Sequence, residues 1–276
     1  MTRIVGVIGH PIGHSLSPAM HAAAIRAAGL DAVYTAIDTS PQHLAPILQA
    51  LIFSGVEGLN VTVPLKERIL PLLNRVDPEA AAVGAINTVV IRDRKTIGFN
   101  TDGIGFRRAI QELGVRPHRT ILLGAGGAAR AVAWELTRVP GSCVTIANRH
   151  PARARALARW LARRRPRACV EASSLRGVAL DGVQLVVNAT TLGMRAADAL
   201  PIDPKQLRRG MVVYDLVYTR ETPLVSAARR RGCVAVGGLS MLLYQGAESF
   251  RLWFHRDPPI DVMRKALEQV LRTQRS

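Results

Sequence analysis

The sequence predicts an α/β protein whose larger part is a doubly wound parallel sheet, and two observations carry this prediction. Short apolar runs alternate with segments of helical periodicity along most of the 276 residues, which is the pattern of strand–helix units on a parallel sheet. An apolar run, a glycine-rich turn and a helix-forming run follow one another over 120–137. Hydrophobic residues make up 48% of the chain, so a sizeable core is available and disorder is disfavoured.

The expected elements follow from periodicity and from glycine and proline positions. Strands are expected at 3–9, 33–37, 59–64, 86–91 and 95–99, and helices at 19–28, 42–53, 66–73 and 104–113. Further on, strands at 121–123, 143–147, 185–188, 211–215 and 233–236 alternate with helices at 131–137, 151–165 and 223–231. Helices at 239–254 and 262–271 close the chain. Ser17 before Pro18 is expected to cap the first helix.

The cysteines and the hydropathy of the sequence limit the classes of protein to which the chain can belong. Cys143, Cys169 and Cys233 lie far apart in the sequence, which suggests neither a disulfide framework nor a metal site and fits a reducing cytosol. Cys143 and Cys233 are expected to be buried thiols. The N-terminus lacks the pattern of a signal peptide, and no run of about 18 apolar residues suggests a membrane span. We expect a cytoplasmic protein that uses no metal.

The formal net charge is +17, and the densest basic segment is 153–167. A nucleic-acid surface and a solvated helix face are both consistent with such a segment. No aromatic interleaving or recognition motif accompanies the arginines, so the solvated face is favoured and nucleic acid is not an expected partner. A general attraction for anionic ligands follows in either case.

The glycine-rich turn is the first candidate site. Gly124 permits a tight turn, Gly126 lets the backbone approach a pyrophosphate, and Ala129 lets the following helix pack close to its strand. The free N–H groups at the start of that helix would hold phosphate charge. An ordinary glycine-rich strand–helix turn is the alternative. Strand, turn and helix in this order favour dinucleotide binding by a Rossmann-type domain.

The next strand predicts which dinucleotide binds. It ends in residues 148–150, Asn-Arg-His, with Arg153 one turn further on, and no carboxylate occurs between Glu135 and Glu171. A site for NAD would place Asp or Glu here to bind the ribose hydroxyls. Arginine instead suits a 2′-phosphate in charge and geometry. The sequence therefore favours NADP, with a solvated strand end as the alternative role of Arg149.

Lys66 and Asp102 are the candidate catalytic residues. Lys66 follows an apolar strand and Pro64, where a lysine can lie at the mouth of a cleft and exchange a proton. Asp102 stands in a glycine-flanked turn and is expected to pair with it. Neutral hydrogen-bonding residues on turns and strand ends would suit a polyhydroxylated substrate: Ser15, Ser17, Thr62, Asn87 and Thr101.

Taken together, motifs from residue 5 to about 250 resemble the shikimate dehydrogenase family, which includes quinate dehydrogenases. The motifs occur in the order His14-Ser-Leu-Ser-Pro18, Asn60-Val-Thr-Val-Pro-Leu-Lys66, Gly84-Ala-Ile-Asn-Thr88, Asn100-Thr-Asp-Gly103, Gly124-Ala-Gly-Gly-Ala128, Asn148-Arg149, Asn188-Ala-Thr190, Tyr214-Asp-Leu-Val-Tyr218 and Gly238-Leu-x-Met-Leu-x-x-Gln245. The resemblance implies NADPH-dependent reduction of 3-dehydroshikimate to shikimate in the synthesis of chorismate and aromatic amino acids.

The resemblance also implies roles and domains. Lys66 would be the general acid/base and Asp102 its partner, while the remaining substrate ligands would be Ser15, Ser17, Thr62, Asn87, Tyr218 and Gln245. The cofactor ligands would be Gly124, Ala125, Gly126, Gly127 and Ala128 at the pyrophosphate, Asn148, Arg149, His150 and Arg153 at the adenosine 2′-phosphate, and Leu216 and Gly238 near the nicotinamide. Residues 1–102 would bind substrate and 103–238 would bind NADP, with helices of 239–276 packing back towards the first domain.

Three departures from the family pattern keep alternatives open. His150 stands where a small hydroxyl residue is common, and Gly237 and Ser240 replace the usual Asp and Gly beside Gly238. There are two competing hypotheses. One is a paralogue that acts on quinate or an aminated shikimate, and the other is a non-catalytic metabolite-binding protein. A homodimer is also left open.

Overall fold

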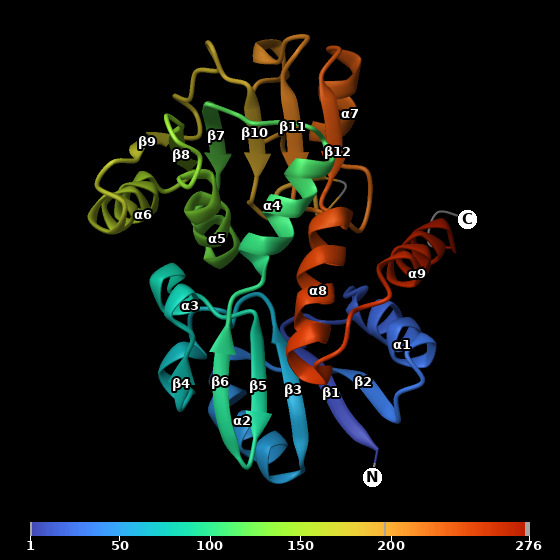
Figure 1. Ribbon diagram of the computed structural model, residues 1–276. Coiled ribbons are helices and arrows are strands. Elements are labelled where there is room, and N and C mark those ends of the chain that lie inside the picture. The colour runs from blue at the N-terminus through green and yellow to red at the C-terminus, as the bar shows by residue number, and fades with distance from the viewer. Residues whose placement is uncertain (1, 196, 274–276) are drawn as a thin grey trace. The chain divides into compact units, whose positions relative to one another are not determined.

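A computed structural model describes residues 2–195 and 197–273, which belong to two compact units (Figure 1). The first unit comprises Met1–Gly105 together with Leu242–Ser276, and the second comprises Phe106–Met241. Each unit is built on its own sheet. In the part of the chain that the structure describes, none of the helices combines the length and the apolar character that crossing a membrane requires.

The sheet of the first unit has the strand order β2-β1-β3-β5-β6-β4. Its strands are β1 Arg3–Gly9, β2 Ala32–Asp38, β3 Val56–Val61, β4 Arg75–Val76, β5 Thr88–Arg92 and β6 Lys95–Phe99. Strands β2, β1 and β3 are parallel, whereas β3, β5 and β6 are successively antiparallel. Asp93 and Arg94, with φ of 49° and 59°, form the tight turn between β5 and β6, as such short hairpins require.

Helices cover both faces of this sheet (Figure 1). They are α1 Ser17–Ala27, α2 Leu44–Phe53, α3 Pro78–Val83, the later part of α8 Leu239–Phe254, and α9 Ile260–Thr273. Leu44 and Leu48 of α2 join the apolar core on one face. On the other face, Trp253 of α8 donates from its indole nitrogen to the Val89 carbonyl at 3.0 Å. A Cβ on Gly58 would lie 2.2 Å from that indole nitrogen, so the glycine lets α8 approach the sheet closely.

A buried histidine lies beneath α8. His21 of α1 is fully buried and stacks on Tyr34 with ring centroids 4.4 Å apart. Burial lowers the pKa of His21 from its ordinary 6.5 to about 3, because the apolar surroundings disfavour the charged imidazolium.

The fold should therefore be acid-sensitive through His21. A pKa below the unfolded value means that the unfolded chain binds the proton first, so stability is lost as pH falls below about 6.5. Each pH unit then removes up to about 1.4 kcal/mol, or about 2 to 3 kcal/mol by pH 4.5. His21→Phe keeps the ring stacking and should remove that part of the pH dependence in urea unfolding at pH 7 and 4.5. His43→Gln, which replaces an exposed histidine of the same unit, is the matched control.

The sheet of the second unit is parallel throughout, with the order β12-β11-β10-β7-β8-β9. Its strands are β7 Arg119–Leu123, β8 Cys143–Asn148, β9 Cys169–Ser174, β10 Leu185–Asn188, β11 Val212–Asp215 and β12 Val234–Gly237. Its helices are α4 Asp102–Glu112, which begins in the first unit, α5 Gly127–Leu136, α6 Pro151–Arg164 and α7 Pro223–Arg230. Numbered from β7, this is the 3-2-1-4-5-6 order of doubly wound dinucleotide-binding folds. The expected fold class is confirmed.

Several local expectations were wrong for identifiable reasons. The helix expected at 66–73 is only a 3₁₀ turn at Leu70–Leu72, because Pro71 denies the segment one backbone donor. Helix α3 was missed although Asp77 caps it, accepting from Glu79 N at 3.0 Å and Ala80 N at 3.2 Å. Ser17 does not cap α1; the helix begins at Ser17 itself. Strands β4 and β9 were also missed.

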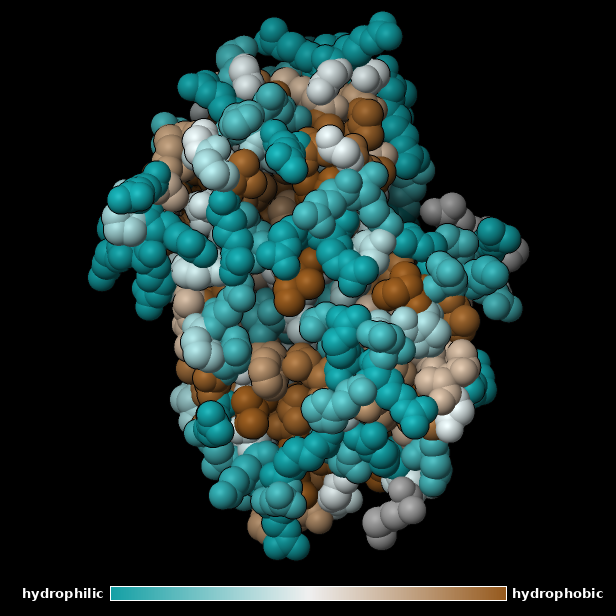
Figure 2. Space-filling view, viewed as in Figure 1, coloured by the Kyte–Doolittle hydropathy of each residue, from teal (hydrophilic) through white to brown (hydrophobic). Residues whose placement is uncertain are grey.

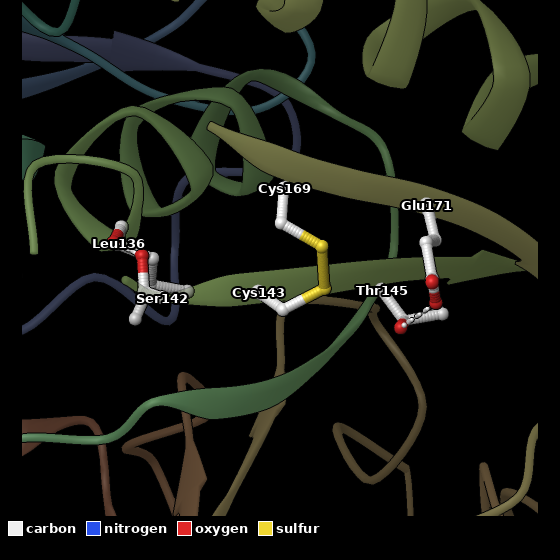
Figure 3. The surroundings of a disulfide bond; sticks show 6 residues. All are labelled: Leu136, Ser142, Cys143, Thr145, Cys169 and Glu171. Carbon is white, nitrogen blue, oxygen red and sulfur yellow. Dashed lines mark hydrogen bonds between the residues drawn. A yellow bond between two sulfur atoms is a disulfide. The ribbon is translucent and has the colours of Figure 1, made fainter. Parts of the chain in front are cut away.

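The expectation that the cysteines form no disulfide is wrong. Cys143 and Cys169 are opposite each other in the register of β8 and β9, with Cα atoms 4.5 Å apart, and form a disulfide (Figure 3). Cys143 is thus not a buried thiol, whereas Cys233 is buried and free. One oxygen of Glu171 lies within 4.8 Å of both sulfurs. In the disulfide, however, the sulfurs are not thiolate ligands for a metal.

Reduction of this disulfide should weaken the second unit. The bond joins residues 26 positions apart, and loop-closure entropy for that separation corresponds to about 3.5 kcal/mol of stability. We expect dithiothreitol to lower the free energy of urea unfolding by about this amount. The double variant Cys143→Ser/Cys169→Ser should start at the lower stability and show no response to dithiothreitol. A response of the double variant equal to that of the wild type would contradict the assignment.

Candidate active site

Sheet topology gathers the polar motifs of the first unit at one edge. Strands β1 and β3 are parallel, so the loops after Gly9 and Val61 leave the sheet at the same edge. Strand β5 is antiparallel to β3 and pairs Thr88 with Asn60, which places Asn87 at that edge as well. Strand β6 returns to it and ends at Phe99. Four separate motifs therefore meet at the carboxyl ends of β1 and β3, where α/β sheets place their ligands.

Lys66 and Asp102 form a buried ion pair at this edge. The Lys66 ammonium donates to Asp102 Oδ2, and the side chains are 13% and 5% exposed. The Lys66 carbonyl accepts from Ile86 N at 2.7 Å, which fixes the backbone before β5. Lys66 and Asp102 are thus brought together as the sequence predicted. Each charge compensates the other, so removal of one would leave a buried charge without its partner.

Asn87 and Gln245 hold the other side of the Asp102 carboxylate. Asn87 Nδ2 donates to Asp102 Oδ1 at 2.9 Å and lies 3.1 Å from Gln245 Oε1. Gln245 in turn donates to the Leu242 carbonyl at 2.9 Å. Both oxygens of Asp102 are therefore engaged, one by an ammonium and the other by an amide. This orients the ammonium and leaves its remaining protons to other acceptors.

The other predicted substrate ligands of this unit lie on the neighbouring loops. Ser15 and Ser17 stand at the start of α1, where the Ser17 N–H donates to Ser15 Oγ at 3.3 Å. Thr62 follows β3 and is half-buried. A Cβ on Gly9 would lie 2.3 Å from Thr62 Cγ2, which places the loops after β1 and β3 side by side. No hydrogen bond among the described residues joins these three side chains to Lys66 or Asp102.

The second unit has a glycine-rich turn after β7. Gly124 has φ of +111°, and a Cβ there would lie 2.7 Å from the Ala189 carbonyl oxygen, so a side chain is excluded. A Cβ on Gly126 would meet nothing within 4 Å. Helix α5 begins at Gly127 without a side-chain cap, which leaves its first N–H groups free for an anion. Ala129 is fully buried against the sheet. These residues fit a bound pyrophosphate.

Arginines stand where a 2′-phosphate would select the cofactor. Arg149 and Arg153 are exposed after β8 and at the start of α6, and neither forms an ion pair with a carboxylate within residues 2–195 and 197–273. Asn148 turns its side chain back to accept from His150 N at 3.0 Å. Hydrophilic side chains cover α6 in Figure 2. The local charge is thus free for an anionic ligand.

The remaining predicted residues lie after β11 and β12. A Cβ on Gly238 would lie 2.3 Å from the Leu216 carbonyl oxygen, so the two predicted nicotinamide neighbours are in close backbone contact. Tyr218 is half-buried and belongs to the second unit. Ser240, which departs from the family pattern, lies 3.1 Å from the Tyr214 hydroxyl. Sequence reasoning missed buried Asp215, whose pKa is raised by burial although Thr222 donates to it at 2.7 Å.

A glycine-rich turn in a sheet of this order defines the class of dinucleotide-binding α/β proteins. Here a second α/β unit carries a buried ammonium–carboxylate pair. The family model for the shikimate dehydrogenase substrate-binding domain matches residues 7–89, and that for the shikimate 5′-dehydrogenase C-terminal domain matches 238–268. The NADP⁺ shikimate dehydrogenase of Moorella thermoacetica is 46% identical, over 98% of this chain and 94% of that protein.

Solved structures agree over nearly the whole chain. A shikimate dehydrogenase in complex with NADP⁺ superimposes with a TM-score of 0.91 at 40% identity, covering 98% of this chain and 96% of that one. The Thermus thermophilus enzyme, in complex with NADP(H) and shikimate, gives 0.85 at 37% identity, covering 97% and 99%. The protein belongs to the shikimate dehydrogenase family.

Three buried residues that contact the site were not predicted as part of it. Asn60, Thr88 and Ser249 are at most 5% exposed and hydrogen-bond to one another. Two sequence signals were present, since Thr88 follows Asn87 and Ser249 lies one helical turn after Gln245. Neither signal separates such residues from ordinary buried hydroxyls until the three elements that carry them are packed together.

Proposed function

We propose that this protein catalyses the reversible NADPH-dependent reduction of 3-dehydroshikimate to shikimate. The observation that carries the proposal is the Lys66–Asp102 pair, buried at the carboxyl edge of the first sheet and oriented by Asn87. Membership of the family supports it, because the relatives named above are NADP⁺ shikimate dehydrogenases. We assign the substrate to the first unit and the cofactor to the second.

Lys66 moves the proton in this proposal. As the ketone is reduced, negative charge develops on its oxygen, and the Lys66 ammonium stabilises that charge and then gives up a proton. In the reverse direction neutral Lys66 accepts the proton of the alcohol. Asp102 keeps the Lys66 ammonium oriented towards the substrate oxygen and compensates its charge before the reaction. Bound NADPH supplies the hydride.

Other residues bind and orient the two ligands. Ser15 and Ser17 would hydrogen-bond the substrate carboxylate from the start of α1, and Thr62, Asn87, Tyr218 and Gln245 would bind its hydroxyls and ring. The free N–H groups at the start of α5 would hold the pyrophosphate. Arg149 and Arg153 would bind the 2′-phosphate, with His150 beside them, and Leu216 and Gly238 would contact the nicotinamide.

Substrate and cofactor comparison tests the proposal. Purified protein should reduce NADP⁺ when given shikimate, and kcat/KM should be higher for shikimate than for quinate and higher for NADP⁺ than for NAD⁺. A higher kcat/KM with quinate would instead assign the quinate activity that the departures at His150 and Gly237 left open. Absence of turnover with shikimate, quinate and aminoshikimate would identify a non-catalytic member of the family.

A further inference from the structure

Ser249 is the centre of a buried hydrogen-bond network behind the Lys66–Asp102 pair. Its side chain is fully buried on α8. Its hydroxyl oxygen lies 2.9 Å from Asn60 Nδ2, 2.8 Å from Thr88 Oγ1, 3.4 Å from Thr101 Oγ1 and 3.0 Å from the Gln245 carbonyl oxygen. These partners come from β3, β5, the segment after β6, and α8 itself. One hydroxyl thus connects four parts of the first unit.

The donors and acceptors restrict the direction of the hydrogen bonds in this network. Asn60 Nδ2 can only donate, so Ser249 Oγ accepts from it. Thr88 Oγ1 donates to Asn87 Oδ1 at 3.1 Å, and a hydroxyl has one hydrogen, so this bond forms when Thr88 accepts from Ser249 Oγ, 2.8 Å away. The Ser249 hydrogen has two acceptors within reach, Thr88 Oγ1 and the Gln245 carbonyl oxygen. With that hydrogen on Thr88, hydrogen bonds run from Asn60 through Ser249 and Thr88 to Asn87.

The bond from Thr88 is one of the contacts that hold the Asn87 amide in its orientation. Asn87 Oδ1 accepts from the Thr101 backbone N–H at 2.7 Å and from Thr88 Oγ1. With its oxygen held by these two donors, the Asn87 amide must turn its nitrogen towards Asp102 Oδ1, an acceptor 2.9 Å away. A reversed amide would place its oxygen against the carboxylate. Thr88 therefore helps to keep Asp102, and through it Lys66, in place.

We infer that Ser249 is a positioning residue for the proposed reaction, acting through Thr88 and Asn87 on the Lys66–Asp102 pair. The inference rests on the proposed function. Ser249 is fully buried, so it does not touch either ligand, and its loss should change the alignment of the reacting groups rather than binding. Without the Ser249 hydroxyl, Thr88 loses a hydrogen-bond partner and the Asn87 amide loses part of the restraint on its orientation.

The main test compares Ser249→Ala with the wild type under saturating and limiting substrate. We expect kcat for shikimate oxidation to fall about tenfold, since small misplacements of reacting groups strongly affect rate, while KM for shikimate and for NADP⁺ changes less than twofold. Ser54→Ala is the matched control. Ser54 makes the same hydroxyl bond to the carbonyl four residues earlier, at 2.9 Å, on the exposed end of α2, and its loss should leave kcat unchanged.

A double-mutant cycle distinguishes positioning from general stability. If Ser249 acts through Asn87, Ser249→Ala should add little further loss to Asn87→Ala, because coupled residues are not additive. An equal loss of kcat in both backgrounds would overturn the inference. So would an unchanged kcat in folded Ser249→Ala, even if its melting temperature falls.

Variants of Thr88 provide a second test if Ser249→Ala does not fold. Thr88→Val should reproduce the loss of kcat, whereas Thr88→Ser, which keeps the hydroxyl, should retain the wild-type rate. Equal rates for the two Thr88 variants would overturn the inference. Absence of turnover in the wild type would overturn the proposed function and this inference together, whereas normal wild-type turnover with an unaffected Ser249→Ala overturns the inference alone.

Discussion

Lys66→Ala is expected to lower kcat about 1,000-fold while KM for shikimate changes little. General acid–base catalysis by a positioned group contributes about 10²- to 10⁴-fold. In this protein the same ammonium also stabilises the developing oxyanion. Both contributions belong to the transition state, so their loss lowers kcat rather than weakening substrate binding. Removal of Lys66 also leaves the Asp102 carboxylate buried without its cation, since both side chains are largely shielded from water.

Steady-state rates of NADP⁺ reduction measure this effect, with thermal unfolding to confirm that the variant is folded. Lys95→Ala is a suitable control, because Lys95 is an exposed lysine at the start of β6 in the same unit. It should keep the wild-type kcat. A Lys66→Ala enzyme that turns over at the wild-type rate would show that another group moves the proton.

The double variant Arg149→Ala/Arg153→Ala is expected to raise KM for NADP⁺ about 100-fold and to leave KM for NAD⁺ nearly unchanged. Hydrogen bonds to charged groups contribute about 1.5 to 3 kcal/mol each, and 2.7 kcal/mol corresponds to about 100-fold. NAD⁺ lacks the 2′-phosphate, so removal of these two arginines takes away no hydrogen bond to NAD⁺. The preference of the enzyme should therefore move towards NAD⁺.

The ratio of kcat/KM for the two cofactors is the appropriate measurement. Arg155→Ala/Arg159→Ala is a matched control, because these arginines are also exposed on α6 and their loss removes the same two charges. If the control lowers NADP⁺ affinity as strongly, general attraction by the basic surface, rather than local binding of the phosphate, selects the cofactor.

The sequence predicted the second sheet well because its signals are local. Apolar runs mark β7, β8, β10 and β11 as strands buried on both faces, and the turn at Gly124–Gly126 marks where the first of them ends. The pairing of Lys66 with Asp102 was also predicted and is confirmed. That expectation came from the turn and strand-end positions of the two residues, and the family motifs supported it, because sequence spacing alone does not bring residues 36 positions apart into contact.

The features that were missed depend on register and packing between distant segments. β9 has an exposed, polar composition with Glu171 and Ser173, so no apolar run marks it as a strand. Without β9 in its register opposite β8, nothing in the sequence brings Cys143 and Cys169 together. Ser249 likewise becomes part of the site only when α8 packs on β3 and β5, a contact between residues 189 positions apart.

The first unit is interrupted in the chain, since Gly105 and Leu242 flank the whole second unit. Translation runs from the N-terminus, so residues 106–241 are complete before Gln245, Ser249 and Trp253 emerge from the ribosome. Until then the sheet face around Gly58 lacks its covering helix, and the Asn87 amide lacks Gln245. A nascent chain that stops at Met241 would thus contain Lys66 and Asp102 but lack the last helices that pack around them. The site around this ion pair is therefore completed only at the end of synthesis.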